Sequence, residues 1–239
     1  MIHPNQRKIV IFDADDTLWE NETYFREAEN ELCTLLADYG TQEEIERELF
    51  RIEMQNMPLY GYGVKAFGLS MMETALFISN NSIEANRIEQ IIRIVKRMLD
   101  APVVLLPDVE EVLKTLSAHY RLILATKGDL LDQERKLRKS ALEGYFHHIE
   151  IMSDKTEKEY AALFRHLDVE PHEVVMIGNS LKSDVLPILT LGGYAFHVPF
   201  YTTWVHEQID QPIESSHFVE ITQLKEILPY LLPKDTDTL

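Results

Sequence analysis

Residues 8–19 have the sequence Lys-Ile-Val-Ile-Phe-Asp-Ala-Asp-Asp-Thr-Leu-Trp, and this stretch decides the fold of the chain. Its continuous apolar run predicts a short strand that is buried on both faces, as in a parallel sheet. Three carboxylates, those of Asp13, Asp15 and Asp16, follow at the carboxyl end of the strand. Open parallel sheets bind their ligands beyond that end, but aspartates also shape ordinary turns. The stretch alone leaves both interpretations open.

The composition is that of a soluble globular protein with an acidic excess. The 239 residues include 23 Lys and Arg against 40 Asp and Glu, which gives a formal net charge of −17. This charge disfavours binding to nucleic acid and to anionic membranes. No apolar run approaches the ~20 residues that span a bilayer, and no signal-peptide core precedes the first strand. We therefore expect a cytoplasmic protein with no membrane or nucleic-acid partner, whereas its oligomeric state is not indicated.

A long helical stretch follows the first strand. Its apolar residues recur at helical spacing, and Thr41 with Glu44 matches a capping box. The glycines at positions 61 and 63 predict a turn over residues 58–63. We expect residues 20–102 to form an all-helical domain inserted between two strands, which could move as a lid. Its helices are predicted at about residues 22–39, 41–55, 64–79 and 82–99.

From residue 107 onward, predicted helices and strands alternate. Alternation of this length is typical of a doubly wound parallel sheet, so the predicted fold class is α/β. Residues 1–19 and 103–239 would form this core. Its later strands are predicted at about residues 121–126, 149–152, 173–178, 194–198 and 218–219, and its helices at 108–119, 129–140, 156–167, 184–191 and from 222 onward.

Polar residues follow four of the predicted strands. If these strands are neighbours in one sheet, their carboxyl ends bring the polar residues to a single edge, where such sheets bind ligands. In chain order the residues are Asp13 and Asp15, Thr126 and Lys127, Lys155, and Asn179 and Asp184.

The order of these motifs resembles that of the haloacid dehalogenase-like superfamily, whose members are hydrolases with an aspartate nucleophile. Each motif alone is weak, but the four occur in order at strand ends across the whole core. The helical insertion is also similar to the first-type cap of this family. The resemblance therefore implies a Rossmann-like core with an inserted helical cap. The matching residues are Asp13, Asp15 and Thr17 for the Asp-x-Asp-x-Thr motif, Thr126 for the strand-end hydroxyl, Lys155 for the lysine, and Gly178, Asn179 and Asp184 for the last motif.

Two carboxylates of the first motif are suited to phosphoryl transfer. Asp13 is the candidate nucleophile, because an ionised carboxylate can attack phosphorus and form an aspartyl-phosphate. Asp15 is the candidate general acid for the leaving oxygen and then the base for the attacking water. Asp16 is expected to take neither role. Trp19, which follows the motif, is a candidate for lining the substrate pocket.

Clustered carboxylates and an anionic substrate favour a hard cation, and Mg²⁺ suits oxygen ligands and phosphate. Asp13 and Asp184 are the expected ligands, and the resemblance adds the backbone carbonyl of Asp15. At Asn179 the chain departs from the commonest family pattern, which has an acidic residue there. The Asn179 amide oxygen could bind Mg²⁺ directly or through water, but it adds no charge.

Thr126 and Lys155 are assigned to the phosphoryl oxygens, and Lys155 would also keep Asp13 ionised. Lys158 competes with Lys155, but it falls inside a predicted helix, where a lysine is more often solvated. Lys127 and Thr17 are further candidates for contact with the substrate phosphate, although each could have a purely structural role.

We therefore predict an enzyme: a Mg²⁺-dependent phosphatase that hydrolyses a small phosphorylated metabolite through an aspartyl-phosphate. A phosphomutase of the same superfamily would hand the phosphoryl group to a sugar instead of water, and the sequence does not separate the two. A haloacid dehalogenase needs neither a metal nor a leaving-group acid, so Asp15 argues against it. A non-catalytic binding or regulatory protein on this fold would be expected to lack Asp13 or Asp15, and both are present.

Overall fold

A computed structural model of the chain describes residues 7–209 and 211–233. The chain divides into two compact units. The first comprises Met1–Glu22, Val103–Lys127 and Lys136–Leu239, and the second comprises Thr23–Pro102 and Gly128–Arg135. This division differs from the expected boundaries because residues 128–135 belong to the second unit. There, Lys65 forms an ion pair with Asp129 at 2.8 Å, and Arg135 donates to the backbone carbonyl of Leu99 at 3.0 Å.

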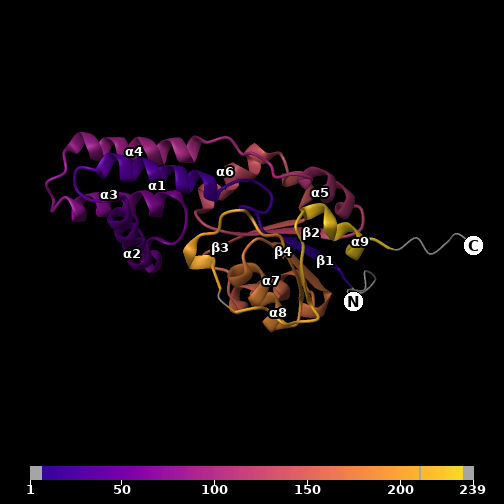
Figure 1. Ribbon diagram of the computed structural model, residues 1–239. Coiled ribbons are helices and arrows are strands. Elements are labelled where there is room, and N and C mark those ends of the chain that lie inside the picture. Colours follow the sequence, from indigo (N-terminus) through magenta and orange to yellow (C-terminus); the bar gives the residue numbers. More distant parts are fainter. Residues whose placement is uncertain (1–6, 210, 234–239) are drawn as a thin grey trace, which may run out of the picture. The chain divides into compact units, whose positions relative to one another are not determined.

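The first unit is built on a six-stranded sheet in the order β3-β2-β1-β4-β5-β6, with every pair of neighbours parallel (Figure 1). β1 is the central strand identified from the sequence, and it pairs with β2 and β4. This arrangement confirms the predicted doubly wound α/β fold. The strands are β1 (Ile9–Phe12), β2 (Arg121–Lys127), β3 (His148–Met152), β4 (Val174–Gly178), β5 (Tyr194–His197) and β6 (Phe218–Glu220).

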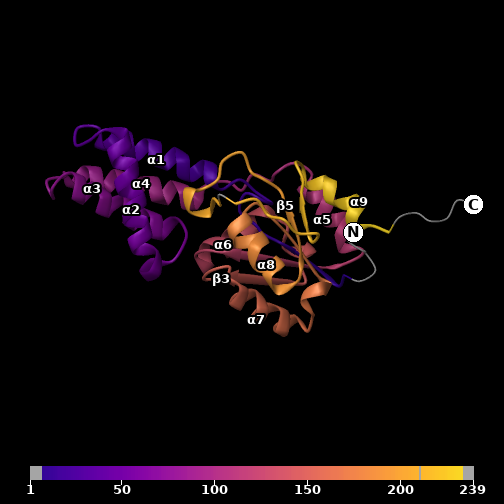
Figure 2. The ribbon, with the colours of Figure 1, turned by 60° about the horizontal axis from the view of Figure 1, so that its bottom comes forward.

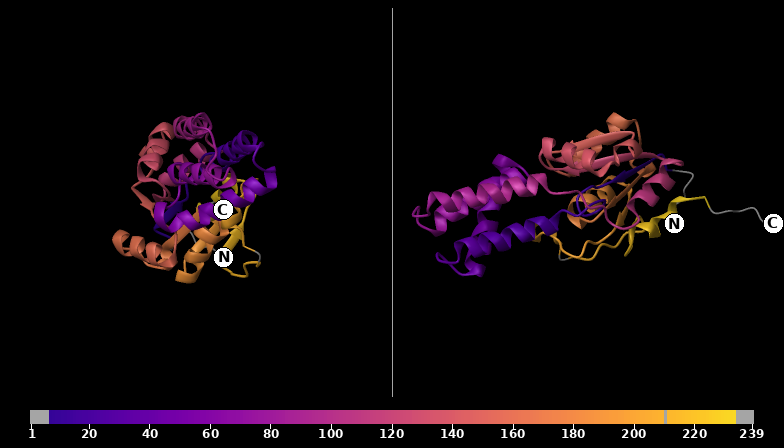
Figure 3. Two further views of the ribbon diagram at one scale, coloured as in Figure 1. Left: turned by 90° about the vertical axis from the view of Figure 1, so that its left-hand side faces the viewer. Right: turned by 90° about the horizontal axis from the view of Figure 1, so that it is seen from above.

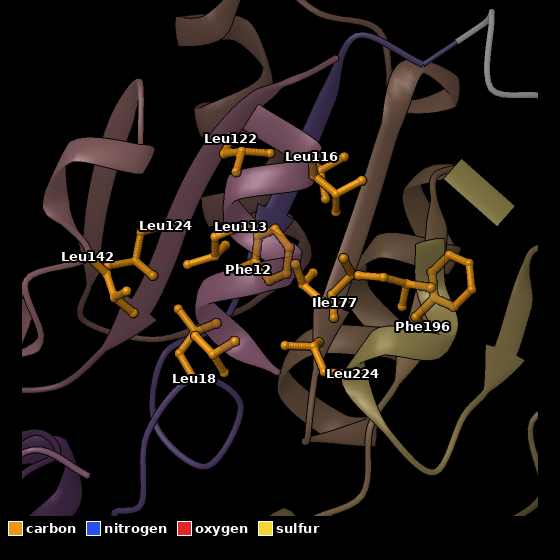
Figure 4. Packing of buried hydrophobic residues seen from close by; sticks show 14 of the residues in the cluster. Phe12, Leu18, Leu113, Leu116, Leu122, Leu124, Leu142, Ile177, Phe196 and Leu224 are labelled. Atoms are coloured by element: carbon orange, nitrogen blue, oxygen red, sulfur yellow. The ribbon is translucent and has the colours of Figure 1, made fainter. Parts of the chain in front are cut away.

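Alternate residues of β1 enter different hydrophobic clusters, as expected of a strand buried on both faces. Val10 and Phe12 pack with residues of α5 (Val109–Ser117), η6 (Leu224–Ile227) and α9 (Leu228–Leu231) (Figure 4). Ile9 and Ile11 pack with residues of α7 (Glu157–Leu167) and α8 (Leu186–Leu191), which lie side by side (Figure 2). These two clusters hold β1 rigidly, so the residues that follow it are firmly placed.

The second unit consists mainly of four helices around their own apolar core. They are α1 (Glu22–Leu36), α2 (Gln42–Tyr60), α3 (Val64–Ile78) and α4 (Ala85–Asp100), and α1 and α4 run side by side (Figure 3). The predicted capping box is confirmed, since Thr41 and Glu44 exchange both hydrogen bonds at the start of α2. No helix in the described part of the chain is long and apolar enough to cross a membrane.

Two local expectations were wrong. The turn predicted at residues 58–63 begins later, because α2 continues through Pro58 and ends at Gly61, which has a φ of 71°. A proline near the end of a helix removes only one backbone hydrogen bond, so the glycine terminates the helix instead. The helix predicted from residue 184 is preceded by η4, a π-helical turn over Leu181–Val185. Such turns are frequent at functional sites.

Candidate active site

The strand ends place the candidate residues together in the first unit. β1 lies between β2 and β4, and the backbone N–H of Asp13 continues the ladder by donating to Ile177 at 2.9 Å. Continued by one residue, the register places Asp13 level with Ala125 of β2, which precedes Thr126, and with Gly178 of β4, which precedes Asn179. Lys155 comes from the connection after β3.

A buried lysine bridges two carboxylates at the centre of this edge. Lys155 Nζ donates to Asp13 Oδ1 at 2.5 Å and to Asp184 Oδ1 at 2.7 Å. All three side chains are at most 8% exposed. The side chain of Lys158, the competing lysine, is 91% exposed, and its Nζ lies 4.0 Å from Glu159 Oε1. The structure therefore brings Lys155, and not Lys158, to the aspartates.

The charges in this triad are strongly coupled. Burial raises the pKa of Asp13 to about 7, despite the opposing effect of the Lys155 ammonium, and the Asp184 carboxylate adds to the increase. Burial opposes the charge on Lys155, but Asp13 and Asp184 outweigh it and raise its pKa well above the ordinary value. Lys155 is therefore a permanent cation in contact with a carboxyl group that titrates near neutral pH.

Asp184 is placed by its backbone surroundings. The N–H of Ser180 donates to Asp184 Oδ2 at 3.0 Å, and the Ser180 side chain accepts from the N–H of Ser183 at the start of η4. A Cβ at Gly178 would lie 2.3 Å from Asp184 Oδ2, so the carboxylate fits only against a glycine. The π-helical turn and Gly178 thus fix a carboxylate that lies 171 residues beyond Asp13 in the sequence.

Thr17 supports Asp13. Its hydroxyl donates to Asp13 Oδ2 at 2.8 Å and lies 3.4 Å from Asn179 Oδ1, and the residue is buried. The Thr17 side chain thus links the candidate nucleophile to the amide oxygen of Asn179. Thr126 is also buried, at the carboxyl end of β2.

The Asp15 carboxylate is held by two residues that sequence reasoning had not connected with it. Lys136 Nζ lies 2.6 Å and 2.7 Å from its two oxygens, and Trp19 Nε1 donates to Asp15 Oδ1 at 2.7 Å. Trp19 is fully buried, so the expectation that it lines the substrate pocket was wrong. An aromatic residue beside the motif indicated importance, but only the structure shows that its indole N–H binds the carboxylate.

Asp16 shapes the chain after the motif. It has a φ of 61°, and its carboxyl group accepts the backbone N–H groups of Asn21 and Glu22, where α1 begins. Burial raises its pKa to about 8, despite these hydrogen bonds. The Asp16 side chain therefore accepts hydrogen bonds at the start of α1.

Lys127 is engaged by a carboxylate from a distant segment. Its ammonium donates to Ser183 Oγ at 2.9 Å and forms an ion pair with Glu207, which also accepts from the hydroxyls of Ser180 and Ser183. Burial would raise the pKa of Glu207, but Lys127 and the two hydroxyls lower it to about 2. Glu207 was missed from the sequence because it ends a single short 3-10 turn, η5 (Val205–Glu207), where no motif marks it.

The donor set determines which metal ion the site could hold. Within residues 7–209 and 211–233, no three His, Cys, Asp or Glu side chains are grouped to bind a metal ion. The available donors near Asp13 are instead carboxylate, amide and backbone carbonyl oxygens, and such a set fits Mg²⁺ better than zinc. The close fit of Asp184 against Gly178 keeps one of these carboxylates at the centre of the site.

Comparisons with known proteins agree with the fold and the motifs. The family model for haloacid dehalogenase-like hydrolases matches residues 7–192. The mouse N-acylneuraminate-9-phosphatase is 27% identical, with 94% of this chain and 93% of that protein covered. The glyceraldehyde 3-phosphate phosphatase of Methanothermobacter thermautotrophicus is also 27% identical, over 92% of this chain and 99% of that protein.

Solved structures show the same similarity. A haloacid dehalogenase-like family hydrolase from Xanthomonas campestris superposes with a TM-score of 0.81 at 36% identity, covering 91% of this chain and 87% of that one. A protein from Bacillus subtilis that was crystallised with magnesium has a TM-score of 0.64 at 17% identity, covering 94% and 98% of the two chains. The second likeness concerns the fold alone.

Proposed function

Because this chain belongs to the haloacid dehalogenase-like hydrolases, we propose that it is a Mg²⁺-dependent phosphatase acting on a small phosphorylated metabolite. The observation that carries the proposal is the contact of the buried Lys155 ammonium with both Asp13 and Asp184. It presents a carboxylate next to a fixed positive charge, as attack on an anionic phosphorus centre requires.

The reaction would proceed in two displacements. In the first, an oxygen of Asp13 bonds to phosphorus, the bond from phosphorus to the leaving oxygen breaks, and a proton from Asp15 passes to that oxygen. In the second, water attacks phosphorus, the bond to Asp13 breaks, and Asp15 takes the proton from the water. Free phosphate then leaves, and both aspartates return to their starting states.

Other residues would neutralise and orient the transferred group. Lys155 and Thr126 would donate to its oxygens, and Thr17 would hold Asp13 through the observed 2.8 Å hydrogen bond. Lys127 contacts Ser183 and Glu207, and these contacts favour a structural role for its ammonium over direct contact with the substrate phosphate. The helical second unit would act as the lid that selects the substrate and excludes bulk water.

Mg²⁺ would be held by Asp13, Asp184 and the Asp15 backbone carbonyl, with the amide oxygen of Asn179 nearby. When bound, the ion would offset the negative charge of the phosphate and of the two carboxylates. The Bacillus subtilis protein of the same fold is bound to magnesium, which supports the choice of ion but says nothing of its ligands here. The curated relatives that are named as phosphatases support the reaction class.

A substrate panel tests the proposed function. Phosphate release would be measured with Mg²⁺ from phosphorylated sugars, sugar acids, nucleotides and short polyols, and chloride release from 2-haloacids would be measured in parallel. We expect at least one phosphate ester to be hydrolysed and no haloacid to be turned over. Transfer of phosphate to a sugar with no net release would identify a phosphomutase, and dehalogenation alone would refute the proposal.

Mg²⁺ binding is expected to depend on pH. Because burial raises the pKa of Asp13 to about 7, a proton competes with the ion below that pH. The dissociation constant for Mg²⁺ should change little above pH 8 and should rise by roughly tenfold for each pH unit below 6. Isothermal titration calorimetry in two buffers of different ionisation enthalpy would measure the affinity and the proton released. EDTA should abolish turnover, and a Mg²⁺ affinity that stays constant from pH 5.5 to 8 would contradict the assignment of Asp13 as a ligand.

A further inference from the structure

We propose that Lys136 is a positioning residue for Asp15, fixing the carboxyl group that transfers protons to and from the reacting oxygens. The inference rests on the proposed phosphatase function and adds a residue to it. Lys136 lies on α6 (Leu130–Ser140), 121 residues beyond Asp15, and belongs to the same structural unit.

The geometry at Asp15 is that of a carboxyl group held from two sides. Lys136 Nζ contacts both oxygens, at 2.6 Å and 2.7 Å, and also contacts Asn21 Oδ1 at 3.1 Å. Trp19 Nε1 contacts Asp15 Oδ1 at 2.7 Å. The Lys136 and Asp15 side chains are 17% and 21% exposed, so water screens their ion pair only in part.

At this edge of the sheet, two lysines contact different carboxylates. Lys155 contacts Asp13 and Asp184, whereas Lys136 contacts Asp15. The two aspartates of the first motif, Asp13 and Asp15, are only two residues apart and would repel each other if both were ionised. Lys136 thus gives Asp15 a cation of its own, separate from the one that Asp13 and Asp184 share.

Fixed orientation matters because proton transfer depends strongly on distance and alignment. A general acid or base must lie within hydrogen-bonding reach of its oxygen, and reorienting it during the reaction adds to the barrier. Lys136 contacts both oxygens of Asp15, so removing the ammonium would leave the carboxyl group less firmly oriented. Lys136 touches neither Asp13 nor Asp184 in these contacts, so its effect should be confined to the steps that need Asp15.

Substrates with different leaving groups separate this role from a merely structural one. Protonation of the leaving oxygen is essential for phenyl phosphate, whose leaving group is poor, but nearly unnecessary for 2,4-dinitrophenyl phosphate. The value of kcat/KM reports the step in which that oxygen leaves. A positioning role therefore predicts a loss that depends on the leaving group, whereas general disruption of the site predicts the same loss for both esters.

The test compares the full-length protein with Lys136→Met, Lys136→Arg and Lys139→Met, with Mg²⁺ present. Lys139 is exposed on the same helix and provides the matched control. We expect Lys136→Met to lower kcat/KM by about 10²-fold for phenyl phosphate and by less than about threefold for 2,4-dinitrophenyl phosphate. Lys136→Arg should recover part of the loss, since a guanidinium can contact both carboxylate oxygens. Lys139→Met should match the unmodified protein.

An equal loss for the two esters in Lys136→Met, or no loss for either, would overturn the proposal. Thermal unfolding of each variant would show whether an equal loss comes from a damaged fold. If the unmodified protein hydrolyses neither ester nor any member of the substrate panel, the proposed phosphatase function fails and this inference fails with it. That outcome is distinct from a phosphatase in which Lys136 has no effect.

Discussion

Replacing Asp13 with asparagine should reduce kcat for phosphate release by at least about 10⁴-fold, because an amide cannot form the aspartyl-phosphate. The fold should survive. An asparagine has nearly the same shape, and it removes a carboxyl group whose pKa burial raises to about 7. Phosphate release with saturating Mg²⁺, together with thermal unfolding, measures both effects.

Asp16→Asn provides the matched control for this variant. Asp16 has a φ of 61°, a conformation that asparagine tolerates well, and an amide oxygen can still accept the N–H groups of Asn21 and Glu22. This variant should keep most of its turnover. If Asp13→Asn kept Mg²⁺-dependent turnover while remaining folded, Asp13 would not be the nucleophile.

Replacing Lys155 with methionine should damage both activity and stability. The variant would leave Asp13 and Asp184 as two buried carboxylates without their shared cation. Breaking a buried ion pair in this way typically costs about 3 to 5 kcal/mol of unfolding free energy, and we expect a loss of that order at pH 8. Turnover should fall by about 10³-fold, because the phosphoryl oxygens also lose a positive charge.

The stability deficit of Lys155→Met should shrink as the pH falls. Burial already raises the pKa of Asp13 in the presence of Lys155, and loss of the ammonium raises it further. A carboxyl group with a raised pKa in the folded state stabilises the fold while it is protonated and loses that contribution as the pH rises through its folded pKa. Urea unfolding at pH 6 and pH 8, without Mg²⁺, measures the difference.

Lys158→Met is the control for Lys155→Met, because it makes the same substitution at a lysine that is 91% exposed. It should leave turnover and unfolding free energy essentially unchanged. A Lys155→Met variant that was as stable as Lys158→Met at pH 8 would show that the two carboxylates do not depend on Lys155.

The sequence predicted the core of the sheet because its signals are local. A short apolar run that ends in polar residues identifies a buried parallel strand and its carboxyl end, and β1, β2 and β4 all follow this pattern. Once the strands are neighbours, residues such as Asp13 and Thr126 lie close together whatever the length of chain between them.

Other features could not be predicted because they depend on contacts between distant segments. Lys136 lies on a charged amphipathic helix, where a lysine is normally expected to face solvent, yet it binds Asp15. Glu207 lies outside any motif, and its importance arises only from the approach of its segment to Lys127. Pro58 and the glycines after it each could have ended the second helix. In the structure α2 continues through Pro58 and ends at Gly61.

The central claim is that the phosphoryl group passes through a covalent bond to Asp13. Sodium borohydride reduces an aspartyl-phosphate to homoserine, so enzyme quenched during turnover and reduced would carry that change at the phosphorylated residue. Trypsin cleaves after Lys8 and Arg26, and mass spectrometry of the peptide of residues 9–26 would locate it. We predict homoserine at position 13 only when substrate and Mg²⁺ are both present. Rapid turnover with no modified Asp13, or with the modification at another residue, would contradict the account.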